Sequence, residues 1–365
     1  MFVRDIKALT GIRGYAAVWV CVHHYAYPSL GANDRGLLLN FLTQGHWGVF
    51  VFFVLSGFLL AYVYSSWFSN SVSSRQYFRF VQLRVARVYP LHFSALCLWL
   101  AAWLLGFIGL NSNDTFYTFV LNLLLVHAWG FTSEISWNQP SWSISTELFS
   151  YLLFPFFFKW VNAKSYFVCV LICVLLLFSI LHPPHVWIVK RLFDIYGYKL
   201  VIKQFDYGLS VITWFYSFAF GVVVFLQAKR SALSALSHDF LVVCGVGLIV
   251  FMLATVGNLN GGEIAMGVSF ASGLVIYGIY NESRVGGIIF GNALSVSLGR
   301  VSYSLYLTHI MFPLIINRAF NVLFHGGSFY DLPVTAQLIV GLILSYFTYK
   351  YFELPFRSYL RSKVH

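Results

Sequence analysis

Residues 46–64 read HWGVFVFFVLSGFLLAYVY and contain no aspartate, glutamate, lysine or arginine. A helix of this length is about 28 Å long, close to the thickness of the hydrocarbon core of a bilayer, about 30 Å. Its small central residues, Ser56 and Gly57, permit a neighbouring helix or a ligand to approach closely, and helix packing is the commoner use. The stretch therefore predicts a transmembrane helix.

The composition of the whole chain indicates the same class. Of the 365 residues, 59% are hydrophobic, 20% are aromatic and only 10% are charged, and the mean hydropathy is +0.76. Soluble domains contain about 25% charged residues, so most of this surface is unsuited to water. We predict an all-α polytopic helical bundle without a soluble domain. It forms one membrane domain over residues 1–365, with an apolar core over 7–352 and a short basic tail over 353–365.

The hydropathy pattern predicts a series of membrane-spanning windows. Eleven are long enough to cross a bilayer: 7–27, 46–64, 91–110, 115–132, 145–162, 164–182, 209–227, 239–256, 263–281, 301–319 and 334–352. Lysines and arginines gather at both termini and in particular connections, which places both termini on the cytoplasmic side. The number of crossings is then even. We expect ten, with one window re-entrant or peripheral, no signal peptide ahead of the first window, and a basic amphipathic surface helix within 183–208.

Two ionisable residues in the first window point to a functional stripe. Arg13 and His24 are eleven residues apart, so in a helix they project from nearly the same face, separated by about 16 Å along the axis. Arg13 alone is equally well explained by snorkelling to the inner headgroups. His24 alone is explained by a neutral imidazole bonded to a neighbouring helix. Their shared face favours a polar path that leads inward from the cytoplasm.

Arg84 and Arg87 form a second basic feature, in RVARVYP at residues 84–90. At this spacing they are neighbours on one helix face, and we expect the helix to end at Pro90. Two guanidinium groups suit a diphosphate because each can bind phosphate oxygens through two hydrogen bonds. A basic helix that grips lipid headgroups is the alternative interpretation.

Glu147 opens an apolar run in QPSWSISTELFSYLLFP, residues 139–155. If Ser143 or Ser145 caps the helix, the carboxylate lies in the first turn, where the helix dipole stabilises it. The alternative is that Glu147 orients a histidine base or stabilises the positive charge of that histidine. The spacing alone leaves both interpretations open.

A third polar stripe lies in GRVSYSLYLTHIMFP, residues 299–313. Ser302, Tyr306 and His309 follow one another at steps of four and three, so they share a helix face. Such a stripe either bonds neighbouring helices together or contacts a hydroxyl-bearing substrate.

The sequence contains no P-loop, dinucleotide-binding glycine motif, HExxH or GxSxG, and we expect no metal site. The net charge of +11 reflects topology and attraction to anionic lipid, and nucleic acid is not an expected partner. Two alternatives to an enzyme stay open. Polar stripes also line the paths of transporters and flippases, and a regulatory membrane protein also binds acidic lipid through arginines.

Taken together, these segments resemble the acyltransferase family 3 membrane domain. The resemblance begins with ALTGIRGYAAVWVCVHH and continues in order through GVFVFFVLSGFLL, RVARVYP, PSWSISTELFSY and GRVSYSLYLTHIMFP to YFELPFR at 351–357. It covers essentially the whole chain. Glu147 matches the first acid of the W-S-x-x-x-E segment of the family. Leu148 stands where many members have a second acid, so one carboxylate is carried over.

The resemblance implies an integral-membrane enzyme that moves an acyl group, often acetyl, from cytoplasmic acyl-CoA to a hydroxyl. The acceptor is then a carbohydrate of the cell envelope, an exopolysaccharide, or a glycosylated lipid or natural product. The location is the plasma membrane of a bacterium. We expect no fused extracytoplasmic SGNH domain, so the group passes to the acceptor directly or through a separate extracytoplasmic transferase.

The resemblance and the residue pattern together assign roles. Arg13, Arg84 and Arg87 are expected to bind the phosphates of acyl-CoA. His24 is the expected general base, with Glu147 orienting its imidazole or stabilising the imidazolium, and a covalent acyl-His24 intermediate stays open as an alternative. Ser302, Tyr306 and His309 are expected to contact the substrate.

Overall fold

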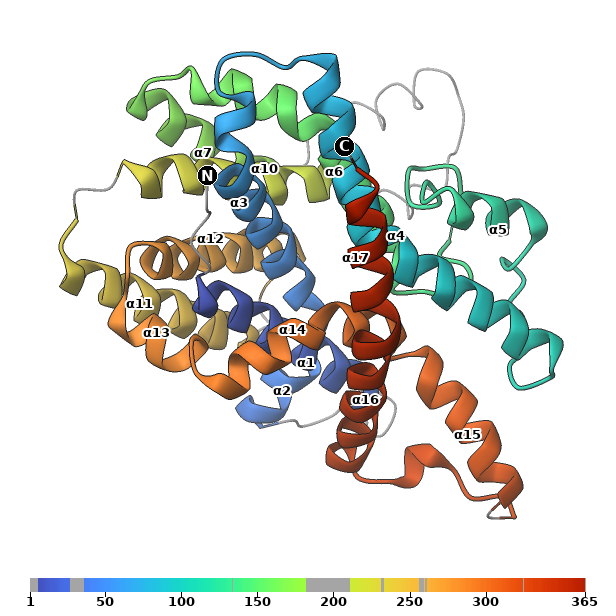
Figure 1. Cartoon of the computed structure of the whole chain (residues 1–365). Coiled ribbons are helices and arrows are strands. Elements are labelled where there is room, and N and C mark those ends of the chain that lie inside the picture. Colours follow the sequence, from blue (N-terminus) through green and yellow to red (C-terminus); the bar gives the residue numbers. More distant parts are fainter. Residues whose placement is uncertain are drawn as a thin grey trace, which may run out of the picture.

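The computed structural model describes residues 6–26, 36–132, 134–181, 211–230, 233–255, 259, 261–323 and 325–364, and it contains helices and no strand in these ranges (Figure 1). The predicted all-α class is confirmed. The α-helices are α1 Lys7–Ala26, α2 Leu37–Thr43, α3 Gly48–Phe68, α4 Ser74–Leu104, α5 Phe116–Leu123, α6 Ser141–Asn162, α7 Tyr166–Leu181, α10 Val211–Lys229, α11 Ala235–Ala254, α12 Gly261–Tyr280, α13 Arg284–Phe290, α14 Ala293–Thr308, α15 Met311–Leu323, α16 Val334–Thr348 and α17 Leu354–Ser362.

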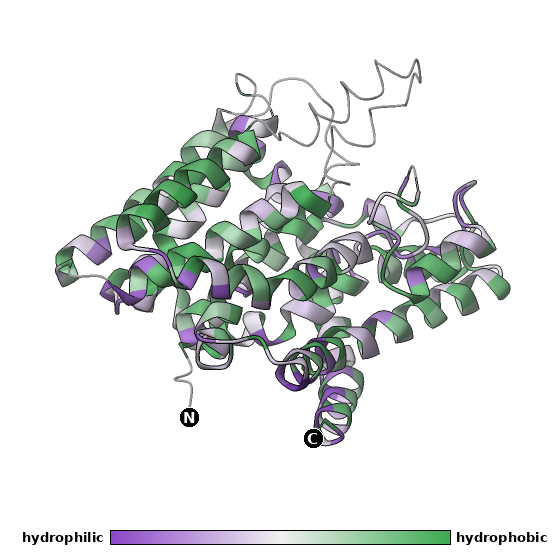
Figure 2. Ribbon diagram, turned by 90° about the horizontal axis from the view of Figure 1, so that it is seen from above, coloured by the Kyte–Doolittle hydropathy of each residue, from purple (hydrophilic) through white to green (hydrophobic). Residues whose placement is uncertain are grey.

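Five of the described helices are long and apolar enough to cross a membrane, or six if the bent pair α13–α14, with an angle of 64°, counts as one span. Apolar residues predominate along the helices (Figure 2), and many large apolar side chains, such as Phe116, Phe167 and Leu236, are exposed. An exposed apolar surface of this extent fits contact with lipid. The number of ten crossings stays a prediction.

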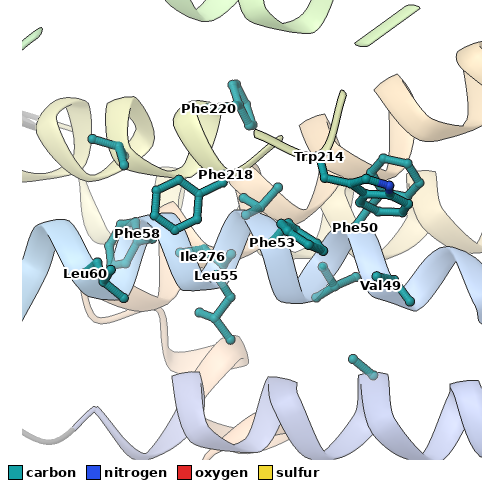
Figure 3. Close-up of a cluster of buried hydrophobic side chains, with 14 of the residues drawn as sticks. Val49, Phe50, Phe53, Leu55, Phe58, Leu60, Trp214, Phe218, Phe220 and Ile276 are labelled. Atoms are coloured by element: carbon teal, nitrogen blue, oxygen red, sulfur yellow. The ribbon is translucent and has the colours of Figure 1, made fainter. Parts of the chain in front are cut away.

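The centre of the bundle is an apolar core between α3, α10 and α12. Phe53, Phe58 and Phe218 are almost completely buried there, and side chains from the three helices meet in one layer (Figure 3). Two glycines let α3 and α10 touch through their backbones. A Cβ atom at Gly57 would lie 1.9 Å from the Phe218 carbonyl oxygen, and one at Gly221 would lie 1.9 Å from the Val54 carbonyl oxygen. Packing is therefore the use of the small residue at 57.

Helices α1 and α14 run side by side along a long contact (Figure 1). Their approach also depends on small residues, since a Cβ atom at Gly299 would lie 1.9 Å from the Thr10 carbonyl oxygen. One at Gly14 would lie 2.6 Å from the Gly299 nitrogen. This contact holds the helix of Arg13 and His24 against the helix of Ser302 and Tyr306.

The window 115–132 is not a single spanning helix, so it is a candidate for the one window expected to be re-entrant or peripheral. Only α5 is helical within it, and Leu125 then adopts a positive φ of 57° that ends the helical path. The segment is held by polar contacts: Asn122 donates to Ser136 Oγ (3.0 Å), and His92 Nε2 lies 2.8 Å from the Asn122 carbonyl oxygen. The leucines give this window a high hydropathy, but hydropathy carries no information about polar contacts of this kind.

Pro90 does not end its helix, which corrects the prediction made from the sequence. Helix α4 continues through it to Leu104. Proline removes one backbone donor, and membrane helices tolerate this loss when hydroxyl groups and neighbouring helices satisfy the freed groups. The carbonyl oxygen that loses its donor is that of Ala86, and the Ser94 hydroxyl adds a bond one turn later, to the Pro90 carbonyl oxygen at 2.9 Å.

Two further windows depart from a single straight helix. Window 301–319 is broken after Thr308, because Pro313 has no N–H to donate to the His309 carbonyl oxygen. The last window passes from α16 through a π-helical turn at Tyr349–Glu353 into α17, so the basic tail is itself helical. The predicted surface helix at 183–208 lies outside the described residues.

Candidate functional site

A cavity of about 450 Å³ lies where α1, α3, α4, α6, α14 and α17 converge. It brings together six of the residues singled out from the sequence, which come from segments far apart in the chain. They are Arg13, Arg84, Arg87, Glu147, Ser302 and Tyr306. His24 and His309 are not among the residues that line it.

The cavity has a strong excess of positive charge. Five arginines and one glutamate line it, the additional arginines being Arg357 and Arg361 of α17. In the described part of the chain, neither Arg13, Arg84 nor Arg87 forms an ion pair. The Nε atoms of Arg13 and Arg84 are buried without a hydrogen-bond partner. Buried donors normally have partners, so these two indicate a place for an anionic ligand.

Aromatic side chains hold Arg84 in place. Its Nη2 donates to the Tyr64 hydroxyl at 2.6 Å, and its guanidinium lies 5.0 Å from the centre of the Tyr64 ring. A guanidinium over an aromatic face is stabilised without losing its charge. Arg84 therefore keeps donors for a ligand, whereas pairing with a carboxylate would occupy them.

Glu147 lies in the second turn of α6, because the helix begins at Ser141 and has no acidic residue in its first turn. Stabilisation of a first-turn carboxylate by the helix dipole is thus the wrong explanation for this residue. Ser56 of α3 donates to Glu147 Oε1 at 2.5 Å. The polar residue in the middle of the apolar stretch 46–64 therefore bonds to the one carboxylate that lines the cavity among the described residues.

Helix α14 forms one wall of the cavity and is fixed to its neighbours. Ser302 Oγ donates to the Gly299 carbonyl oxygen at 2.8 Å. The Tyr303 hydroxyl donates across to the Val88 carbonyl oxygen of α4 at 2.5 Å. Ser302 and Tyr306 therefore share one face, as the sequence predicted.

His24 and His309 form a pair just beyond this cavity. His309 Nε2 lies 3.2 Å from His24 Nδ1, and the ring centres are 4.8 Å apart. His309 is buried and its ring centre lies 5.9 Å from that of Tyr306, which does line the cavity. Tyr306 therefore separates the pair from the cavity, and Arg13 lies eleven residues from His24 along α1, on the order of 16 Å.

The hydrogen bonds of this pair determine its tautomers. His24 Nδ1 lies 2.9 Å from the Val20 carbonyl oxygen, and His309 Nδ1 lies 2.6 Å from the Tyr306 carbonyl oxygen. A carbonyl oxygen only accepts, so in both neutral rings the proton is on Nδ1. Each Nε2 then carries a lone pair. The one Nδ1 proton of His24 is shared between the Val20 carbonyl oxygen and His309 Nε2, and the Nε2 of His24 has no partner in the described part of the chain.

The two predicted catalytic residues do not meet directly. Glu147 bonds to Ser56, whereas His24 is oriented by Val20 and His309. In the described ranges no hydrogen bond joins Glu147 to His24. The role of Glu147 in orienting the imidazole stays a prediction.

Comparison with known proteins places the chain in a family. The sequence matches the model described as an acyltransferase domain over residues 6–350. The chain belongs to this acyltransferase family. Acyltransferase MdmB of Streptomyces mycarofaciens is 35% identical over 165 residues, which cover 43% of the chain and 40% of MdmB. The chain thus matches about two fifths of the length of this relative. No solved structure matches it.

Just after the range matched by the acyltransferase domain, helix α17 contributes Arg357 and Arg361 to the cavity, and the sequence did not predict this. Glu353 is buried, accepts from Ser304 Oγ at 2.7 Å and pairs with Arg357 at 3.3 Å. The π-helical turn at Tyr349–Glu353 shifts the register just before α17 begins. The signal was present in YFELPFR, where an acid four residues before an arginine interrupts an apolar run.

Proposed function

We propose that the protein is a membrane O-acyltransferase that moves an acyl group, acetyl in the simplest case, from acyl-CoA to a hydroxyl of a carbohydrate. The acceptor belongs to an envelope glycan, an exopolysaccharide, or a glycosylated lipid or natural product. The observation that supports this most directly is the cavity with five arginines and one carboxylate, in which two buried Nε donors have no partner.

Coenzyme A is a suitable ligand for this charge pattern. Its diphosphate and 3′-phosphate are multiply negative, and guanidinium groups bind phosphate oxygens in pairs. Arg84 and Arg87 on α4, Arg13 on α1, and Arg357 and Arg361 on α17 approach from three helices. Anionic lipid headgroups would need basic residues at the surface, whereas Arg13 and Arg84 each carry a buried donor.

The histidine pair supplies a neutral imidazole whose Nε2 lone pair can accept a proton, as a general base must. His24 Nε2 takes the proton of the acceptor hydroxyl while the oxygen attacks the thioester carbonyl. The carbon–sulfur bond then breaks, and the thiolate of CoA takes the proton back from Nε2. General-base catalysis of this kind contributes about 10²–10⁴-fold to a rate.

The thioester has to pass Tyr306 to reach this base, since Tyr306 lines the cavity and lies against His309. Ser302 and Tyr306 would contact the acyl-pantetheine end on the way. The hydrogen bond of Glu147 goes to Ser56, so the carboxylate would not bond the imidazole directly. Its negative charge would instead stabilise the imidazolium. This effect is stronger in a water-poor interior than in solution.

The proposed setting is the plasma membrane of a bacterium, with both termini in the cytoplasm. The basic α17 then contributes its arginines on the side where acyl-CoA is found. The acyl group passes to the acceptor directly or through a separate extracytoplasmic transferase.

The test uses purified full-length protein, radiolabelled acetyl-CoA, and membranes of the native cells from which the gene has been deleted. The proposal predicts release of CoA and incorporation of label into glycan-bearing material. A protein that moves glycan or lipid across vesicle membranes without consuming acetyl-CoA would instead be a transporter or flippase. That result would refute the proposal.

A further inference from the structure

We propose that a second cavity, between the C-terminal end of α4 and α15, binds the carbohydrate acceptor. Its volume is about 580 Å³. The inference rests on the proposed acyl transfer and assigns the site of the second substrate. Acyl-CoA and acceptor then enter through separate cavities.

The chemistry of this cavity differs from that of the arginine cavity. Four side-chain amides line it, and no carboxylate does so among the described residues: the amides are Asn111, Gln139, Asn317 and Asn321. An amide both donates and accepts hydrogen bonds, as a sugar hydroxyl does. One arginine, Arg318, adds a donor fork. The four amides and Arg318 together match the hydrogen-bonding groups of a neutral or weakly acidic polyhydroxylated ligand.

Two aromatic residues add apolar surface and a free donor. Trp99 and Phe107 line the cavity, and Trp99 is only 3% exposed. The Trp99 Nε1 donor is buried and has no hydrogen-bond partner. A buried indole N–H normally finds a partner, so this donor indicates a ligand acceptor atom at the cavity.

One of the amides is held in a fixed orientation. Asn317 Oδ1 accepts from Ser328 Oγ and from the Phe329 backbone N–H, both at 2.8 Å. Because the backbone N–H can only donate, the oxygen of the amide must face it. The NH₂ group of Asn317 is therefore left for a ligand.

His309 lies along the chain between a residue of the arginine cavity and a residue of the second cavity. On α14–α15, Tyr306 lines the arginine cavity, His309 contacts His24, and Ile310 lines the second cavity. On α4, Trp99 follows Arg87 by twelve residues, about 18 Å along the axis. An acceptor in the second cavity would therefore approach His24 from the side opposite to the thioester.

The test compares three variants, Trp99→Phe, Arg318→Ala and Asn321→Ala, with Arg300→Ala as the matched control. Arg300 is an exposed arginine of α14 that lines neither cavity. One assay measures the amount of glycan-bearing membrane needed for half-maximal incorporation of label from acetyl-CoA. The other measures CoA binding to the purified protein by calorimetry. Size-exclusion chromatography shows which variants are folded.

We expect each cavity variant to raise the half-maximal amount of membrane at least about fivefold, since each removes a donor to the acceptor: a buried one at Trp99, and exposed ones at Arg318 and Asn321. The dissociation constant for CoA should stay within about twofold, and Arg300→Ala should match the wild type. Trp99→Phe keeps an aromatic ring and removes the indole N–H together with part of the ring volume, so it tests the contribution of the indole even if the alanine variants are unstable.

Two results overturn the inference, and they are distinguishable. Unchanged transfer by folded Trp99→Phe, Arg318→Ala and Asn321→Ala, in a wild-type background that binds CoA and transfers acetyl, refutes the acceptor site alone. A wild-type protein that neither binds CoA nor transfers acetyl refutes the proposed function together with it.

Discussion

His24 illustrates how a backbone carbonyl prepares a side chain for chemistry. The Val20 carbonyl oxygen is one turn earlier in the same helix and holds the proton on Nδ1. His309 lies behind that same nitrogen. The reactive lone pair is therefore directed away from both partners. No carboxylate is needed for this orientation.

Replacing His24 by asparagine should abolish transfer while leaving acyl-CoA binding intact. An asparagine retains polar atoms in the site and has no basic nitrogen, so kcat should fall at least about 100-fold. CoA affinity, measured by calorimetry, should change by less than about twofold because His24 does not line the arginine cavity. The neighbouring His23→Asn is the control. Retained turnover by His24→Asn would remove this residue from the chemistry.

Arg87→Ala should weaken binding of acyl-CoA specifically. A charge-assisted hydrogen bond contributes about 1.5–3 kcal/mol, so we expect KM for acyl-CoA to rise about tenfold or more, with the apparent KM for acceptor unchanged. Arg79→Ala is the matched control, since Arg79 is on the same helix but lies over Trp67 outside the cavity. An equal effect of both variants would indicate a general role of α4 charge in topology.

At the residue scale, the sequence predicted which side chains form the site but not all of the contacts between them. Helical spacing correctly placed Arg84 beside Arg87 and Ser302 beside Tyr306, because such neighbours depend only on local geometry. The bond from Ser56 to Glu147 and the pair of His24 with His309 join residues that are 91 and 285 positions apart. Spacing within one helix carries no information about such contacts.

At the scale of elements, the contact of α1 with α14 positions most of the site. Gly299 is the point of closest approach, and an added methyl group there would meet the Thr10 backbone oxygen at 1.9 Å. Since backbone atoms cannot rotate away, the two helices would have to separate. The first helix bears Arg13 and His24, and the second bears Tyr306 and leads to His309.

Gly299→Ala should therefore lower both stability and transfer. Overpacking costs about 1–3 kcal/mol, which should appear as a lower midpoint of thermal unfolding in detergent. Transfer should fall further than CoA binding, because His24 and His309 lose their mutual position. Gly287→Ala in α13 is the control, since nothing lies within 4 Å of its added Cβ. A Gly299→Ala protein as stable and active as the wild type would refute the tight contact.

The sequence predicted the presence of helices better than the residues at which they begin and end. The ends of α1, α6 and α10 lie close to the predicted windows, since long apolar runs determine them. Pro90 and Pro313 were harder to interpret, because the effect of a proline depends on what satisfies the freed carbonyl oxygen. Helix α4 continues through the first proline, and the helical path breaks before the second. That outcome depends on neighbours that the local sequence does not contain.

At the scale of the whole molecule, the described polar groups include those of two cavities and of a buried network around Asn122. The arginine cavity gathers groups from α1, α4 and α17, and the amide cavity gathers groups from the end of α4 and from α15. The path from Asn321 to Lys363 contains α16, the π-helical turn and α17. Residues 334–353 in helical form are about 30 Å long, enough for one crossing by length, although this segment is not one of the five or six candidate spans among the described helices.

The two cavities should accordingly face opposite sides of the membrane. In intact cells, an impermeant maleimide should label Asn321→Cys, whereas Lys363→Cys should be labelled only after permeabilisation. Cys97 is exposed in the structure, so both substitutions belong in a Cys97→Ser background, which also serves as the unlabelled control. Labelling of both positions in intact cells would place the amide cavity and the basic helix on one side. In that case the thioester and the acceptor would enter from the same compartment, and the histidine pair would not separate two entrances.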